Sequence, residues 1–285
     1  MGRHEVDVED LEYLRVGGQA LLARVFRPRG KGPFPAVVDG HGGAWIQGSR
    51  VNNDVINRTV AEGGVVVVSA DYRIPPEASY PGSVADMNYA VRWLKANADR
   101  FGTRPDSVGL MGTSSGGHLA VLAALKPFDP RYASLPLPDG SIDAKVAFLV
   151  ALWPVICPWG RFNDLKERAA RGEEHYADRV GASQGQMKYW LTEEAMAEGS
   201  PTLALERGDP VELPDVLYVQ ALCDKLHPRS NMNQFVTNYL WRGGQAEVHL
   251  FEGEPYDLLR SRPDSKSARE TFARIVRFIR NYANQ

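Results

Sequence analysis

The fold is decided by the stretch VGLMGTSSGGHL, residues 108–119. The apolar residues 107–111 predict a buried strand, residues 112–117 a tight turn, and residues 118–125 the beginning of a helix. The turn holds the pattern Gly-X-Ser-X-Gly with Ser114 at its centre. A strand that passes abruptly into a helix at such a serine is typical of a nucleophile elbow, which presents the serine hydroxyl at the carboxyl edge of a sheet.

The spacing of the glycines selects Ser114 over Ser115. A turn this tight leaves no room for bulk two residues before and two residues after the serine, and Gly112 and Gly116 meet that need only for Ser114. The start of the following helix also favours negative charge developing beside the serine. We therefore predict Ser114 as a catalytic nucleophile.

Strand and helix patterns alternate outward from this stretch. Continuous apolar runs at residues 65–70, 146–155 and 215–222 predict strands buried on both faces, as in a parallel sheet. Helical periodicity recurs at residues 83–101, 232–241 and 265–282, and a Gly17-Gly18 pair predicts a hairpin near the beginning of the chain. The pattern predicts an α/β fold, with residues 1–285 as a single domain.

About 60 residues interrupt this alternation between the strands that end near Val155 and begin near Asp215. The segment is charged and contains aromatic residues. We predict that it is a helical cap insertion, about residues 156–212, over one end of the sheet. The alternative is a pair of surface helices packed elsewhere.

Composition excludes several classes of protein. The chain has 285 residues with 33 Lys and Arg against 35 Asp and Glu, so it lacks the basic excess of a nucleic-acid or anionic-membrane binder. The acidic N-terminal stretch does not resemble a signal peptide, which predicts a cytoplasmic protein. The two cysteines lie far apart in the sequence, and we expect two thiols. No metal-ligand spacing is present, so no metal is predicted.

A second motif, HGGAW at residues 41–45, also ends an apolar strand. Acyl transfer needs N–H donors aimed at a tetrahedral oxyanion, and glycine leaves the backbone open to approach. We expect the N–H groups of Gly42 and Gly43, together with that of Ser115, to form an oxyanion hole. The imidazole of His41 is expected to brace this loop.

Together, HGGAW and GTSSGGHL resemble motifs of the α/β-hydrolase superfamily, specifically of the hormone-sensitive-lipase-like esterases. HGGAW is also similar to the HGGxW variant of kynurenine-formamidase-like members, and DYRIPPE at residues 71–77 resembles the family's YRLAPE segment. The resemblance covers about residues 20–280. It implies an α/β-hydrolase fold with a mostly parallel eight-stranded sheet flanked by helices, a helical cap, and Ser–Asp–His chemistry on small esters. It implies no cofactor, because water completes the cycle.

The resemblance also assigns the partners of Ser114. Asp224 matches the family's acid, at the end of the strand before it. The family's histidine follows the next strand, and the matching residue here is Tyr256. A phenol with a pKa near 10 is ionised in only about one molecule in 10³ at pH 7, so Tyr256 is predicted to be a poor base. His227, three residues after Asp224, is the alternative base.

The other histidines are predicted to have different roles. His118 is expected to brace the core one turn after Ser114, and His249 to lie within a strand. His175 belongs to the insertion and would reach the site only if the insertion folds over it.

Ala44 stands where the family has a third oxyanion glycine and bears on the shape of the acyl pocket. The aromatic residues Trp45, Trp159, Tyr189 and Trp190 are predicted to contact the substrate, which favours an apolar or aromatic ester. The alternative is that they form the core of the insertion.

Three hypotheses follow for function. The first is a serine carboxylesterase acting through an acyl-enzyme on small esters, impaired because Tyr256, engineered or natural, replaces the base. The second is an amidase or formamidase, or a non-hydrolytic enzyme, that uses Tyr256 or His227. The third is a catalytically silent protein that binds a ligand on the hydrolase fold. The predicted partner is a small-molecule ester or amide, and a homodimer is an open alternative.

Overall fold

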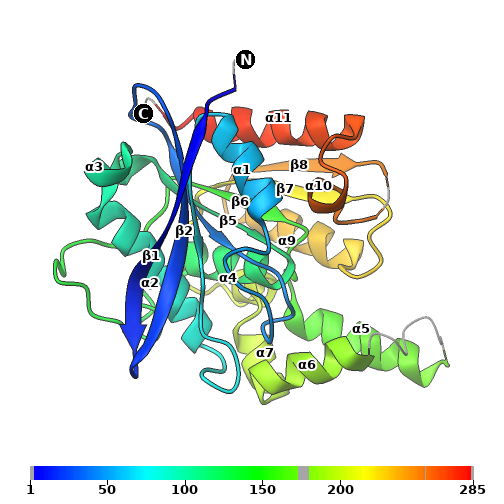
Figure 1. Ribbon diagram of the computed structural model, residues 1–285. Helices are drawn as coiled ribbons and strands as arrows, with labels where there is room; N and C mark the ends of the chain where they lie inside the picture. Colours follow the sequence, from blue (N-terminus) through cyan, green and yellow to red (C-terminus); the bar gives the residue numbers. More distant parts are fainter. Residues whose placement is uncertain (1–2, 173–179, 254, 284–285) are drawn as a thin grey trace.

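The computed structural model describes residues 3–172, 180–253 and 255–283, with the side chains of residues 180–184 left out. Eight strands form one sheet in the order β1-β2-β4-β3-β5-β6-β7-β8 (Figure 1). The strands are β1 (Val6–Val16), β2 (Gln19–Pro28), β3 (Ala36–Gly40), β4 (Val66–Ala70), β5 (Val108–Thr113), β6 (Phe148–Leu152), β7 (Asp215–Ala221) and β8 (Ala246–Phe251).

Only the first two strands depart from the parallel arrangement. β1 pairs antiparallel with β2 around the Gly17-Gly18 turn, and β2 pairs antiparallel with β4. From β4 to β8 every pairing is parallel. The central strands β3 to β6 are buried along their whole length, which agrees with their continuous apolar sequences. The predicted mostly parallel eight-stranded sheet is confirmed.

Helices cover both faces of the sheet and bury two apolar clusters. On one face α2, α4 and α9 contribute residues such as Met87, Leu119 and Phe235. On the other face α1, α10 and α11 contribute residues such as Ile56 and Ile275. The bounds are α1 (Asp54–Glu62), α2 (Gly82–Ala96), α4 (Ser114–Leu125), α9 (Arg229–Trp241), α10 (Leu258–Ser261) and α11 (Lys266–Arg280), with the short α3 (Ala98–Phe101) and a 3₁₀ turn η1 (Pro105–Ser107) before β5.

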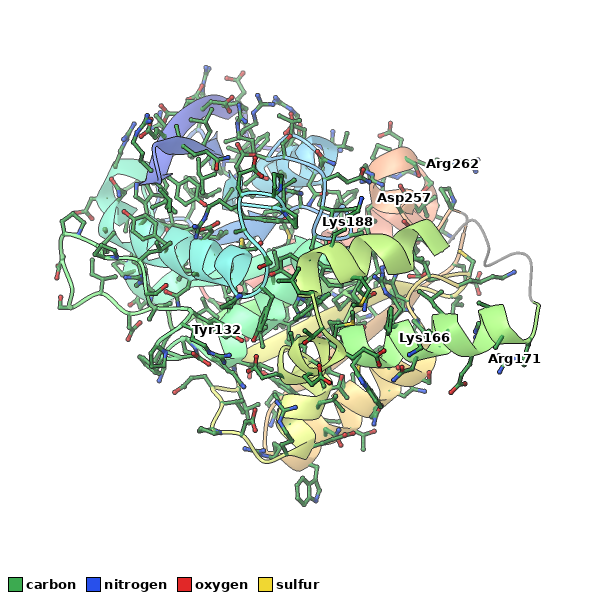
Figure 2. The ribbon with its side chains drawn as sticks, turned by 90° about the horizontal axis from the view of Figure 1, so that it is seen from below. Tyr132, Lys166, Arg171, Lys188, Asp257 and Arg262 are labelled. Atoms are coloured by element: carbon green, nitrogen blue, oxygen red, sulfur yellow. The ribbon has the colours of Figure 1, made fainter. Side chains whose placement is uncertain are left out.

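Four helices lie between β6 and β7, where the sequence predicts an insertion. They are α5 (Pro158–Ala170), α6 (Val180–Trp190), α7 (Glu193–Glu198) and α8 (Pro201–Glu206). Figure 1 shows α5, α6 and α7 gathered beyond one end of the sheet. From below, α5 and α6, marked by Lys166 and Lys188, extend across this end of the molecule (Figure 2).

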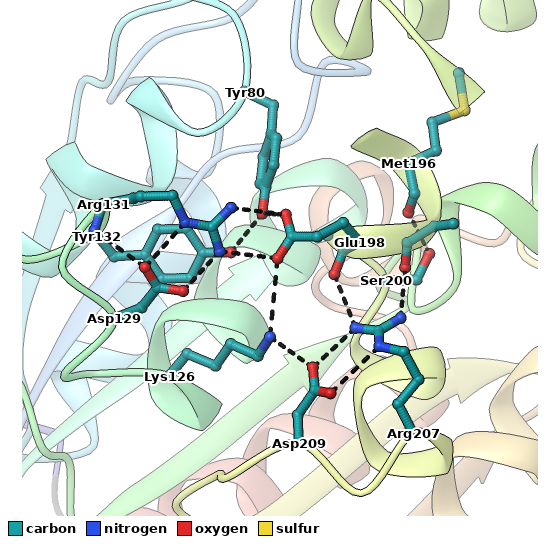
Figure 3. A network of polar contacts seen from close by, with 12 residues as sticks. Tyr80, Lys126, Asp129, Arg131, Tyr132, Met196, Glu198, Ser200, Arg207 and Asp209 are labelled. Carbon is teal, nitrogen blue, oxygen red and sulfur yellow. Dashed lines mark hydrogen bonds and ion pairs between the residues drawn. The ribbon is translucent and has the colours of Figure 1, made fainter. Parts of the chain in front are cut away.

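A polar network fixes the α7 end of this helical insertion to the core (Figure 3). The Glu198 carboxylate accepts hydrogen bonds from Tyr80 and from both Nη atoms of Arg131, at 3.0 and 2.8 Å. Lys126, at the end of α4, lies 2.8 Å from Asp209, which in turn pairs with Arg207. The insertion is thus attached to the same helix that begins at Ser114.

Candidate active site

β5 passes directly into α4 at Ser114. The helix begins at Ser114 itself, four residues earlier than the sequence predicts, because the tight turn is already the first turn of the helix. The φ angle of Ser114 is 53°, in the left-handed region that residues other than glycine rarely adopt. Such a conformation costs about 1–3 kcal/mol and persists only where the surroundings impose it.

Close backbone packing imposes the turn. A Cβ atom on Gly116 would lie 2.2 Å from the carbonyl oxygens of Gly40 and His41, and one on Gly112 would lie 2.6 Å from the carbonyl oxygen of Gly116. β3 and β5 are also paired in register, with Gly40 opposite Gly112. The glycines therefore allow the loop after β3 and the start of α4 to approach each other beside Ser114.

A chain of hydrogen bonds runs from Ser114 through His227 to Asp224. The Ser114 Oγ atom lies 3.0 Å from His227 Nε2, and His227 Nδ1 lies 2.8 Å from Asp224 Oδ2. A carboxylate only accepts hydrogen bonds, so Nδ1 carries the proton and Nε2 accepts from the Ser114 hydroxyl. Both side chains beyond the serine are buried, at 2% exposed for His227 and 0% for Asp224.

One short turn after β7 holds both Asp224 and His227. The other carboxylate oxygen of Asp224 accepts from the backbone N–H groups of Leu226, at 2.9 Å, and His227, at 3.0 Å. Gln220 donates to the carbonyl oxygen of His227 at 2.7 Å. Burial alone would raise the pKa of Asp224, but the His227 imidazole and these N–H groups outweigh it and hold the pKa below its usual value.

This arrangement differs from the sequence expectation for Tyr256. The imidazole on the Ser114 hydroxyl is that of His227, because the turn after β7 folds back so that the third residue beyond Asp224 reaches the serine. Tyr256 lies beside this histidine, with ring centroids 5.6 Å apart, and lines the cavity next to Ser114. His227, the alternative candidate, thus occupies the position that the resemblance assigned to Tyr256.

The remaining histidines of the described chain are held elsewhere. His118 accepts from Trp45 Nε1 and donates to the carbonyl oxygen of Gly199, and His249 contacts Thr271. His41 stacks on Tyr72 with ring centroids 4.2 Å apart. His175 lies outside the described residues.

The predicted oxyanion residues surround Ser114. Gly42 and Gly43 line the same cavity as the serine, and a Cβ atom on Gly42 would lie 3.4 Å from the Ser114 Cβ atom. Gly43 has a φ angle of 134°, and a Cβ atom there would lie 1.9 Å from the carbonyl oxygen of Gln47. Ser115 follows at the start of α4 and is buried. The structure thus brings the two backbone segments together, the loop after β3 and the start of α4.

A cavity of about 480 Å³ opens beside Ser114. Its described lining is mainly polar and backbone: Gly42, Gly43, Ala44, Gln47, Gly48, Asn52, Thr113, Ser114, Trp153, Arg161, Leu226, Tyr256 and Arg260. Ala44 is the one predicted substrate residue in this set.

The four aromatic residues that were predicted to contact the substrate are absent from the described lining of this cavity. Trp45, Tyr189 and Trp190 are buried and pack on one another, and His118 packs against Trp45 and Trp190. Trp159 is 38% exposed on α5. The structure therefore favours the alternative in which Trp45, Tyr189 and Trp190 form a core between the insertion and the sheet.

Several lining residues were not predicted from the sequence, and Arg161 is the buried charged residue among them. It is buried on α5, on the same face as the apolar residues Phe162 and Leu165. A charged residue at a buried position of an amphipathic helix was the available signal.

Comparison with solved structures shows that the chain has the fold of known esterases. The chain superposes on the hyperthermophilic esterase from the archaeon Pyrobaculum calidifontis with a TM-score of 0.77 and 25% identity, over 99% of this chain and 88% of that one. It also matches EstE1, a thermostable carboxylesterase cloned from a metagenomic library, with a TM-score of 0.75 and 24% identity, over 99% of this chain and 92% of that one. The chain belongs to the α/β-hydrolase superfamily.

Sequence comparison gives a narrower match. Residues 25–155 match the family model described as BD-FAE. The esterase LipC of Mycobacterium tuberculosis is 32% identical over 233 residues, which is 80% of this chain. The chain spans 54% of the length of LipC, about half of that relative.

The described residues contain no group of three or more His, Cys, Asp or Glu side chains arranged to hold a metal ion. Cys157 and Cys223 are free thiols. None of the described helices is both long and apolar enough to cross a membrane.

Proposed function

We propose that the protein is a serine carboxylesterase that hydrolyses small esters through an acyl-enzyme. The observation that carries this proposal is the continuous relay from Ser114 Oγ through His227 to Asp224, at 3.0 and 2.8 Å. The names of the relatives, which are esterases, support it. The relay supports an active hydrolase, in contrast to the impaired one that the sequence predicts from Tyr256.

Acylation begins when the Ser114 Oγ atom attacks the ester carbonyl carbon. His227 Nε2 accepts the hydroxyl proton as the new C–O bond forms, and the imidazolium then donates this proton to the leaving alkoxide as the ester bond breaks. Asp224 keeps Nδ1 protonated and stabilises the positive charge that forms on the ring. The products of this half-reaction are the alcohol and an acylated Ser114.

The oxyanion is assigned to backbone N–H groups. Gly42 and Gly43 lie on the loop that touches Ser114, and the N–H of Ser115 belongs to the first turn of α4. Donors fixed before the reaction stabilise the charge that develops on the carbonyl oxygen without reorganising. The left-handed conformation of Ser114 orients the hydroxyl toward the same cavity.

Deacylation repeats these steps with water. His227 Nε2 removes a proton from the water that attacks the acyl carbon, and returns it to Ser114 Oγ as the acid leaves. One ester and one water give one acid and one alcohol, and no further reactant is needed.

The helical insertion is proposed to act as a cap over the cavity. Its helix α5 contributes Arg161 to the wall of the cavity that Gly42 and Gly43 also line. The polar network at Glu198 fixes the other end of the insertion to the core. Tyr256 is proposed to shape the cavity next to the histidine, without serving as the base.

The experiment is hydrolysis of 4-nitrophenyl acetate by the purified protein, with labelling of Ser114 by a fluorophosphonate. We expect turnover and stoichiometric labelling of the parent protein. Ser114→Ala should lose labelling and on the order of 10⁴-fold or more in kcat/KM. Absence of both turnover and labelling in the parent protein would refute the esterase proposal and favour the ligand-binding hypothesis.

A further inference from the structure

Arg161 places a buried positive charge in the wall of the cavity that contains Ser114. The side chain comes from α5 and is 3% exposed. It lines this cavity and also a small pocket that His227 lines. Arg161 is thus a residue of the insertion that lines the same cavity as Ser114.

The guanidinium is held rigidly by neutral groups. Its Nε and Nη2 atoms donate to Gln186 Oε1, at 3.2 and 2.8 Å, and its Cζ atom lies 5.4 Å from the centre of the Trp45 ring. Gln186 is fixed in turn by donating to the carbonyl oxygen of Pro158 at 2.6 Å. The amide oxygen must therefore face Arg161.

Arg161 forms no ion pair in the described part of the chain. The Asp224 carboxylate, which favours the charged form of Arg161 from beyond ion-pair distance, is hydrogen-bonded to His227 at 2.8 Å. No described carboxylate lies within ion-pair distance of it, and Nη1 donates no hydrogen bond to a described residue. The second arginine of the cavity, Arg260, is different because Asp257 lies 2.6 Å from it. The described cavity lining contains two guanidinium groups and no Asp or Glu.

A buried cation without a counter-ion is unfavourable, and it persists where a ligand supplies the opposite charge. Burial lowers the pKa of Arg161 to about 10, which still leaves the group cationic at neutral pH. The fork of guanidinium donors matches the planar geometry of a carboxylate. The wall thus combines a fixed charge, a free donor and an adjacent nucleophile.

We propose that the substrate is an ester that carries a carboxylate, and that Arg161 binds this carboxylate while Ser114 attacks the ester group. The inference rests on the proposed esterase function and narrows its substrate class. It replaces the expected apolar or aromatic ester with an anionic one, such as the half-ester of a dicarboxylic acid. Binding energy from the carboxylate then positions the ester carbonyl at the elbow.

The test compares two substrates with one leaving group, mono-4-nitrophenyl adipate and its neutral methyl ester. We expect the parent protein to hydrolyse the carboxylate ester at least about 10-fold faster in kcat/KM, since hydrogen bonds to charged groups are worth about 1.5–3 kcal/mol, or 10- to 100-fold. Raising the ionic strength should reduce this preference only slightly, because the charge is buried.

Arg161→Met should abolish the preference: the ratio of kcat/KM for the carboxylate ester to kcat/KM for the methyl ester should fall about 10- to 100-fold. Lys166→Met is the matched control. It removes the same charge from the same helix by the same substitution, but Lys166 is exposed and pairs with Glu193 at 2.8 Å. This control should keep the preference of the parent protein.

Each outcome separates the inference from the proposal on which it rests. Equal rates for the two esters in the parent protein would overturn the carboxylate assignment and leave the esterase proposal standing. Hydrolysis of neither ester would overturn the esterase proposal. Calorimetry with hexanoate and hexanol on Ser114→Ala then decides the inference alone: stronger binding of hexanoate supports it, and equal binding overturns it.

Discussion

Two turns at the same edge of the sheet form the proposed catalytic site, and they are held by different forces. The elbow between β5 and α4 is held by contact between backbones, with room for no Cβ atom on Gly112 or Gly116. The turn after β7 is held by polar side-chain contacts, in which Asp224 accepts from two N–H groups and from the His227 ring. Steric contact fixes the nucleophile, and hydrogen bonding fixes the acid and the base.

The difference determines what each turn shows in the sequence. A steric requirement restricts two positions at fixed spacing to glycine, so the elbow is visible as a pattern. A hydrogen-bonded turn requires only an acceptor at its start, and Asp is common in turns that have no catalytic role. The spacing of Asp224 and His227 therefore carries little information before the fold is known.

The largest expected effect is at the base. His227→Ala should reduce kcat/KM on 4-nitrophenyl acetate on the order of 10⁴-fold or more, because no acceptor then remains on Ser114 Oγ. Tyr256→Phe, which removes only a hydroxyl, is the matched control and should change kcat/KM by less than about 10-fold. Both variants are measured at pH 8 after a check that they are folded. A larger loss of kcat/KM in Tyr256→Phe than in His227→Ala would identify Tyr256 as the base.

Asp224→Asn tests the polar turn with a smaller expected loss, about 10³- to 10⁴-fold in kcat. Asparagine keeps an acceptor for the N–H groups of Leu226 and His227, but its amide N–H₂ faces His227 Nδ1. The ring then turns to the tautomer that is protonated at Nε2, which cannot accept the Ser114 proton. Normal activity with an unchanged unfolding midpoint would show that Asp224 is not needed to orient the histidine.

Gly116→Ala tests the steric turn. The added methyl group meets two carbonyl oxygens at 2.2 Å, so we expect the free energy of unfolding to fall by about 3 kcal/mol or more. Gly140→Ala is the control, because a Cβ atom there meets nothing within 4 Å. Urea unfolding of the two variants measures the difference. Equal stabilities would contradict the close approach between α4 and the loop after β3.

The smallest expected effect concerns pH and the helix after the elbow. Burial lowers the pKa of His118 from 6.5 to about 4. The unfolded state therefore binds the extra proton first, and stability decreases as the pH falls below 6.5 toward 4. His118→Gln keeps an acceptor for Trp45 and a donor for Gly199 but does not titrate.

The parent protein should thus lose about 2 kcal/mol of unfolding free energy relative to His118→Gln between pH 7 and pH 5. The carboxyl of Asp224 behaves differently, since its lowered pKa preserves its contribution until the pH falls below about 3.8. A constant difference between the two proteins over this range would contradict the neutral, buried state of His118.

Much of the fold follows from the sequence. Continuous apolar runs predict the buried strands β4 and β6, and the Gly17-Gly18 pair predicts the first hairpin, both of which the structure contains. The predicted boundaries of strands and helices differ from the observed ones by a few residues where one motif ends a strand and also begins a helix. The clearest case is Ser114, which the sequence places in a turn and the structure places at the start of α4.

The site is less predictable because it depends on how separate segments meet. Ser114 and the glycines of the HGGAW motif line one cavity, and Ser114 is linked to Asp224 through His227. His227, and not Tyr256, contacts the Ser114 hydroxyl because of the path of the turn after β7. The hydrophobic periodicity of the sequence does not reveal that path. The buried aromatics Trp45 and Tyr189 pack against each other instead of the cavity, because the insertion needs its own apolar contact with the sheet.

Asp224 and His227 are three residues apart, so one turn after β7 holds both the proposed acid and the proposed base. The chain beyond this turn, including β8, α10 and α11, then supplies no member of the proposed relay. A chain with this arrangement would be classed as a pseudoenzyme by any rule that requires a histidine beyond the last strand. A histidine three residues after the acid is therefore a second position to examine before such a protein is called inactive.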